Sequence, residues 1–197
     1  MRPELPIELP IPEPKEEADL LVVDFSEVEV MEKLGQGGLA IVHRAKFQGT
    51  VGAVKLCRDQ GFLTSGQMEM DRNAVQEEAM LLHRLKHPLL VEVVAIIQKQ
   101  GQVSGVLLEL LGLTLYDEAN APGFQPQNLK QALADVTTGL EHLHKALVAH
   151  NDIKAHNMAS SHRGFRTPGG HHQPETGPCA ALAPGGLQEP TPRPPPV

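Results

Sequence analysis

Hydrophobic and polar positions divide the chain into short β-prone runs, two amphipathic stretches and two polar ends. The β-prone runs lie between glycine-containing or polar turns and predict five strands: Ser26–Leu34, Leu39–Phe47, Val51–Cys57, Leu89–Ile97 and Val103–Leu110. Apolar residues recur at helical spacing in Ser65–Lys86 and from about Asn128 to Lys145, which predicts two helices. The order of these elements predicts an α+β fold.

Two ionisable side chains fall on surfaces that are otherwise apolar. Glu78 lies on the stripe that Val75 and Leu82 form along the first predicted helix, and Lys55 lies in an apolar strand. A carboxylate that faces a core is costly unless it is paired. The pattern therefore predicts a Lys55–Glu78 ion pair. A lysine that reaches solvent along its own aliphatic stem is the alternative.

Gly35, Gly37 and Gly38 form a turn between the first two predicted strands. Glycines in a turn allow backbone amides to approach a phosphate without an intervening Cβ. A hairpin whose glycines only satisfy turn dihedrals is the alternative. In the next strand, alternation places Val42 on the face of Arg44. An isolated apolar residue on that face needs an apolar partner, and an adenine ring is one candidate.

The loop His150–Asn157 contains a carboxylate, an ammonium and an amide within six residues, at Asp152, Lys154 and Asn157. A carboxylate can accept a hydroxyl proton, an ammonium can meet a phosphate, and an amide can hold a metal. Short polar loops with Asp and Asn also occur as ordinary turns.

Five features occur in a fixed order: the glycine turn, the strand lysine, the helix glutamate, the apolar run to Leu110 and the polar loop. Together they resemble the protein kinase family over about Val28–Met158. This resemblance implies a small lobe with a five-stranded antiparallel sheet and one helix, followed by the first helices of the large lobe. Lysine two residues after Asp152 is similar to the serine/threonine-kinase form, and the texture of the glycine turn resembles the tyrosine-kinase-like branch.

The resemblance also implies roles for single residues, with ATP and Mg²⁺ as cofactors and a protein as substrate. It gives catalytic roles to Asp152, Lys154, Lys55 and Glu78, and metal binding to Asn157. The positions that it assigns to the nucleotide are Gly35, Gly37, Gly38, Val42, Ala53, Lys55, Leu108, Glu109 and Leu111. Leu108 matches the gatekeeper position, and Glu109–Leu111 matches the hinge.

Several positions depart from the kinase pattern. Ala40 replaces the third glycine, Gly52 replaces the first valine of the strand motif, and Asn151 replaces the usual arginine. No Asp-Phe-Gly follows Met158. We therefore expect a kinase domain truncated after the catalytic loop, as in a truncated isoform, which transfers phosphate poorly or not at all. The alternatives are a non-catalytic pseudokinase or decoy module and a chain that does not fold stably by itself.

The two ends of the chain differ from its middle in composition. Five of the 17 prolines lie in residues 1–14 and nine in residues 159–197. This bias predicts a disordered leader at 1–19, a partial kinase domain at 20–158 and a disordered Gly/Pro-rich tail at 159–197. The run Pro190–Pro196 predicts a polyproline ligand for an SH3-like domain.

Charge and cysteine content exclude several classes of protein. The net charge is -7 and no basic stripe occurs, so we expect no nucleic-acid partner. No apolar run is long enough to span a bilayer, and we expect no association with a membrane. Cys57 and Cys179 make an unpromising disulfide pair, which favours a reducing, cytoplasmic compartment.

Overall fold

The larger sheet contains all five predicted strands and one more. In the computed structural model, which describes residues 20–37, 40–58, 64–124, 126–161 and 180–182, its strand order is β1-β5-β6-β4-β3-β2. The bounds are β1 Val22–Asp24, β2 Glu29–Gln36, β3 Ala40–Phe47, β4 Thr50–Cys57, β5 Val93–Lys99 and β6 Gln102–Glu109. The strands from β2 to β6 pair antiparallel with their neighbours, which confirms the predicted sheet.

The sixth strand was not predicted. β1 lies parallel to β5, with Val22 opposite Ile96, and a short 3-10 helix, η1 (Phe25–Glu27), links it to β2. The predicted start of the fourth strand at Leu89 is wrong, because β5 begins only at Val93. Residues 89–91 are buried outside the strand, so their apolar character reflects packing rather than strand pairing.

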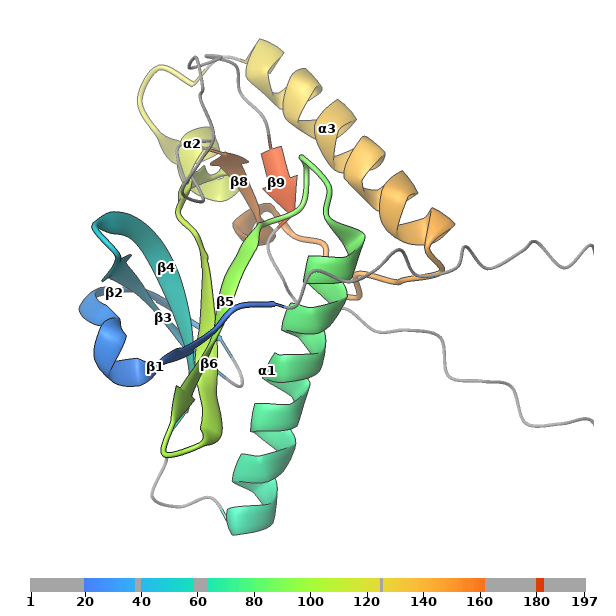
Figure 1. Cartoon of the computed structure of the whole chain (residues 1–197). Helices are drawn as coiled ribbons and strands as arrows, with labels where there is room; N and C mark the ends of the chain where they lie inside the picture. Colours follow the sequence, from blue (N-terminus) through green and yellow to red (C-terminus); the bar gives the residue numbers. More distant parts are fainter. Residues whose placement is uncertain (1–19, 38–39, 59–63, 125, 162–179, 183–197) are drawn as a thin grey trace, which may run out of the picture.

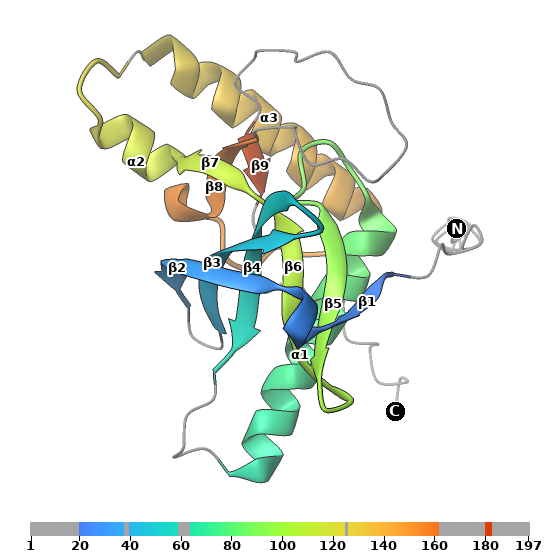
Figure 2. The same cartoon turned by 60° about the vertical axis from the view of Figure 1, so that its left-hand side comes forward.

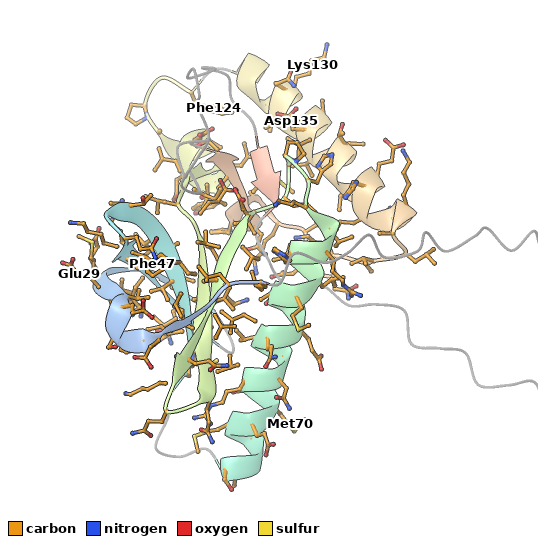
Figure 3. The ribbon with its side chains drawn as sticks, in the orientation of Figure 1. Glu29, Phe47, Met70, Phe124, Lys130 and Asp135 are labelled. Carbon is orange, nitrogen blue, oxygen red and sulfur yellow. The ribbon has the colours of Figure 1, made fainter. Side chains whose placement is uncertain are left out.

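Helix α1 (Ser65–Leu85) covers one face of the sheet (Figures 1 and 2). Thr64 caps its first turn by accepting a hydrogen bond from the amide of Gln67 at 3.3 Å. Val75 and Leu82 are buried against the sheet, as the predicted stripe requires. Met70, near the first turn of the helix (Figure 3), is 72% exposed.

The rest of the described chain forms a second layer beyond one end of the sheet (Figure 1). β7 (Leu111–Thr114) leads into α2 (Leu115–Asn120), α3 (Pro126–Lys145), a 3-10 turn η2 (Ala155–Asn157) and β8 (Met158–Ser161). β9 (Ala180–Leu182) completes a small sheet in the order β7-β8-β9. α3 begins at Pro126, two residues before the predicted start at Asn128.

Two strand segments lie beyond Met158, where the tail was predicted to begin. β8 extends to Ser161, and β9 pairs with it in antiparallel register from Ser160 opposite Ala180 to Met158 opposite Leu182. The predicted leader at 1–19 and most of the predicted tail, including Pro190–Pro196, lie outside the described residues. None of the helices in the described ranges is both long and apolar enough to cross a membrane.

One core joins the two layers. Ala53 and Leu82 from the first layer and Leu143 and Met158 from the second belong to one cluster of buried residues. A second cluster fills the opposite face of the larger sheet, where Phe47 (Figure 3) packs with Val23, Val54, Ile97 and Leu107. Residues on both faces of the larger sheet are therefore buried, and α1 lies on the face that bears Lys55.

The apolar stripe of α3 is covered only in part. Val136 and Leu143 are buried, whereas the side chain of Leu133 is 49% exposed. Leu147, which lies just beyond the helix, is 69% exposed. β9 contacts this helix.

Candidate active site

The ladder of β3, β4 and β6 gathers four of the nine predicted nucleotide residues on one face. Val42 lies opposite Lys55, and Lys55 lies opposite Val106. Ala53, two residues before Lys55, lies opposite Leu108. Directly opposed residues and residues two apart on a strand share a face. The backbone register therefore brings Val42, Ala53, Lys55 and Leu108 together.

Lys55 meets the helix glutamate on that face. Its Nζ lies 2.5 Å from Oε2 of Glu78, and the two side chains are 18% and 12% exposed. The predicted ion pair is therefore present. Within the described part of the chain, Oε1 of Glu78 is buried without a hydrogen-bond partner. A donor brought to this position would therefore satisfy a carboxylate oxygen that the fold leaves unsatisfied.

The glycine turn is open around its first two glycines. Gly35 lies opposite Val42, and the amide of Gly37 donates to the carbonyl of Ala40 at 2.9 Å. A Cβ at Gly35 would meet no atom within 4 Å, and one at Gly37 would meet only the Ala40 carbonyl at 3.8 Å. Neither glycine has a positive φ. The fold itself therefore gives no reason for glycine here. Gly38 lies outside the described residues.

The predicted hinge connects the two layers. Glu109 is buried, and it binds Glu92 twice: its carboxylate accepts the Glu92 amide at 2.9 Å, and its own amide donates to the Glu92 carbonyl at 3.0 Å. Leu111 then begins β7 and lies opposite Ser161 of β8. The hinge is thus joined to the strand that directly follows Asn157.

The loop that was predicted to be catalytic is held by its own side chains. Oδ2 of Asp152 accepts from Nζ of Lys154 and from Nδ2 of Asn157, each at 2.8 Å. Nδ2 of Asn157 also donates to the backbone carbonyl of Asp152 at 2.8 Å. His150 is buried, and its Nδ1 accepts the amide of Asp152 at 3.3 Å. Asn151 has a left-handed φ of 58°, a conformation that asparagine tolerates well.

These hydrogen bonds set the ionisation of the loop carboxylate. The bond from Lys154, followed by that from Asn157, holds the pKa of Asp152 below its ordinary value. Asp152 is therefore ionised at neutral pH and able to accept a proton.

A sequence profile for the protein kinase domain matches residues 28–165. The chain belongs to the protein kinase family.

Individual kinases resemble this one over most of its length. A probable serine/threonine-protein kinase of Dictyostelium discoideum is 27% identical, over 69% of this chain and 15% of its own. A putative serine/threonine-protein kinase/receptor of Acanthamoeba polyphaga mimivirus is 31% identical, over 69% of this chain and 8% of its own. Calcium/calmodulin-dependent protein kinase type IV of Mus musculus is 28% identical, over 68% and 27%. The chain thus spans about a quarter or less of these relatives.

Kinases in general use ATP and a divalent metal. The described residues of this kinase include no group of three or more His, Cys, Asp or Glu side chains that could hold a metal ion. Magnesium is usually held by one or two carboxylates together with phosphates and water. Asp152 and Asn157 supply too few donor atoms to hold Mg²⁺ without the phosphates of ATP.

Sequence reasoning missed three residues around this kinase site. A Cβ at Gly105 of β6 would lie 2.5 Å from the Lys55 carbonyl, so glycine is needed where β6 approaches β4. An isolated glycine in a strand is a signal of such an approach. Tyr116 of α2 stacks on His156 of the catalytic loop, with centroids 4.0 Å apart. Arg58 donates to the carbonyl of Gly37. No sequence signal marks the last two contacts.

Proposed function

We propose that this chain is an ATP-binding kinase domain and that its family chemistry is phosphate transfer to serine or threonine. The observation that carries the proposal is the placement of the Lys55–Glu78 pair. It shares a face with Val42, Ala53 and Leu108, beside a glycine turn that is open where a ligand would lie.

The nucleotide would occupy that face of the sheet. Val42, Ala53 and Leu108 supply apolar contacts for adenine, and backbone atoms of Glu109 and Leu111 are the candidates for its polar edge. The amide of Glu109 is already bonded to Glu92, so its carbonyl is the better candidate. Gly35, Gly37 and Gly38 would admit the phosphates, and Lys55, held by Glu78, would contact them.

In the proposed transfer the catalytic loop would handle the proton and the terminal phosphate. The carboxylate of Asp152 accepts the proton of a serine or threonine hydroxyl as that oxygen bonds to phosphorus, and the bond to the leaving ADP oxygen breaks. Lys154 would turn from Asp152 to the γ-phosphate. Both side chains are well exposed, at 52% for Lys154 and 38% for Asp152, so this rearrangement needs no repacking.

We also propose that phosphate transfer by these 197 residues is slow or absent. Asp152 is the last aspartate in the sequence, so no Asp-Phe-Gly carboxylate is available to a metal. Asn157, the proposed Mg²⁺ ligand, would be completed only by phosphate oxygens and water. Among the residues that the structure describes, Cys57 is a free thiol, which supports the proposed reducing, cytoplasmic location.

A non-catalytic interaction module is the second candidate, and the absence of that aspartate favours it. The proposed SH3-like partner would bind Pro190–Pro196, outside the described residues. Partner binding that persists in Lys55→Met, measured where this variant is still folded, would support this candidate, because the module would not need the proposed phosphate contact of Lys55.

Thermal unfolding of the full chain with ATP and with ATP plus Mg²⁺ tests the proposal. A ligand at 100 times its dissociation constant adds about 2.7 kcal/mol to the free energy of unfolding. We expect ATP to raise the melting temperature of the wild type by several degrees and that of Lys55→Met by much less. A cooperative melt that does not respond to nucleotide would contradict ATP binding and favour the interaction module.

A phosphotransfer assay tests the second half of the proposal. We expect little or no transfer to a serine/threonine substrate protein above the level of Asp152→Asn, used as the matched control. Transfer that Asp152→Asn abolishes would contradict the claim that the chain is inactive.

A further inference from the structure

A second cation lies beside the nucleotide face, on the same segment as Lys55. Arg58 directly follows β4, three residues after Lys55. The β3–β4 ladder reaches Ala40 opposite Cys57, so Arg58 lies just past this end of the ladder. The glycine turn enters β3 at the same end. Arg58 thus lies against the turn and not against the residues proposed to contact adenine.

Arg58 bonds to the backbone of the turn. Its Nη2 donates to the carbonyl of Gly37, whose amide donates to the carbonyl of Ala40 at 2.9 Å. Gly37 is therefore held through both its amide and its carbonyl.

The energetics of this arginine do not favour a purely stabilising role. Its Nε is buried and has no hydrogen-bond partner among the described residues. A buried donor without a partner opposes folding. A shorter polar residue would avoid this penalty, but it would lose the bond to Gly37. We therefore infer that Arg58 acts mainly by fixing the position of the turn.

We propose that Arg58 is a positioning residue for the phosphates of the nucleotide. It holds Gly37 of the glycine turn in place before the ligand arrives, and it adds positive charge beside the phosphates. The proposal rests on the proposed ATP binding. It predicts a selective defect, because the turn serves the phosphates while adenine lies against Val42, Ala53 and Leu108.

Calorimetric titration of the full chain with ATP and with adenosine tests this selectivity. A charge-assisted hydrogen bond is worth enough to change affinity about tenfold. We expect Arg58→Gln to lower the affinity for ATP about tenfold and to leave the affinity for adenosine within about twofold of the wild-type value. Arg58→Lys, which keeps the charge and a donor, should recover part of the loss. The matched control is Arg72→Gln, because Arg72 of α1 bonds the side chain of Gln102 rather than the backbone of the turn.

Equal weakening of ATP and adenosine by Arg58→Gln, or no weakening of either, would overturn the proposal. If the wild type binds neither ligand, the proposed function fails. Hydrogen exchange of the unliganded chain then tests whether the Arg58–Gly37 hydrogen bond holds the turn. Peptides that contain Gly37 and Ala40 should exchange faster in Arg58→Gln than in the wild type or Arg72→Gln. Unchanged exchange would show that Arg58 does not hold the turn.

Discussion

The Lys55–Glu78 pair and the Asp152–Asn157 loop carry the same kind of polar chemistry but are built in different ways. Lys55 and Glu78 come from a central strand and a helix 23 residues apart, and their side chains are 18% and 12% exposed. Asp152, Lys154 and Asn157 lie within six residues, and two of their side chains are 52% and 38% exposed. The first site depends on the packing of the fold, whereas the second depends on local hydrogen bonds.

This difference separates stability from chemistry. A charge that loses its partner in a poorly solvated site destabilises the fold. An exposed polar group that loses a partner is solvated by water, so the fold is little affected. A single substitution at the packed pair should therefore change folding and ligand binding together, whereas substitutions in the loop should change only chemistry.

The largest effect is expected at the packed pair. Lys55→Met leaves Glu78 as an unpaired carboxylate and should lower the free energy of unfolding by about 3 kcal/mol. The double variant Lys55→Met/Glu78→Leu removes both charges and should return to within about 1 kcal/mol of the wild type. Urea unfolding measures both values. A double variant no more stable than Lys55→Met would show that packing, not the unpaired charge, causes the loss.

The next largest effect is expected at Gly105, which supports Lys55 from the neighbouring strand. A Cβ there would lie 2.5 Å from the Lys55 carbonyl and 2.9 Å from the side chain of Leu56. Gly105→Ala should therefore lower the free energy of unfolding by about 2 kcal/mol, as overpacking does. It should also lower the affinity for ATP. Gly66, where a Cβ meets nothing within 4 Å, provides the matched Gly→Ala control and should not be destabilised. Equal melting temperatures for the two variants would contradict the close approach of β6 to β4.

In the loop, Asp152→Asn should leave the free energy of unfolding nearly unchanged. The carboxylate is exposed, and asparagine preserves its size. ATP-induced stabilisation should also persist, because Asp152 is not among the residues proposed to contact the nucleotide. Thermal unfolding with and without ATP measures both quantities. A loss of several degrees without ligand would mean that this loop, like the Lys55 pair, is part of the structural core.

The smallest effect concerns the acid stability of the same loop. The Lys154 and Asn157 hydrogen bonds lower the pKa of Asp152 in the folded state. A lowered folded-state pKa stabilises the protein above the unfolded-state pKa, and this stability is lost as the pH falls through the folded value. Below about pH 4, the wild type should lose slightly more stability than Asp152→Asn. Parallel acid-unfolding curves would contradict the assigned hydrogen bonds.

The parts that the sequence predicted well share one physical reason. Glu78 on an apolar helix stripe and Lys55 in an apolar strand each required a partner, so the pair could be inferred before any coordinates. The strands from β2 to β6 and both long helices follow from hydrophobic pattern. The proximity of Asp152, Lys154 and Asn157 followed from their spacing, because residues this near in sequence can hydrogen-bond within one loop.

The parts that were missed depend on contacts between segments far apart in sequence. β1 is three residues long, too short to show a pattern, and its pairing with β5 is set by tertiary structure. The burial of residues 89–91 made a loop resemble a strand. The contact of Arg58 with Gly37 spans 21 residues, and the stacking of Tyr116 on His156 joins α2 to the catalytic loop. Neither contact follows from residue type or local spacing.

The most direct test of the account is calorimetric titration of ATP into the full-length wild type and into Lys55→Met/Glu78→Leu. The two proteins should be similarly stable, so a difference in affinity reports on the nucleotide site and not on folding. The account predicts saturable binding to the wild type and at least about tenfold weaker binding to the double variant, the value of one charge-assisted hydrogen bond. Equal affinities, or no binding to a cooperatively folded wild type, would contradict the claim that Lys55 and the packed sheet face form an ATP site.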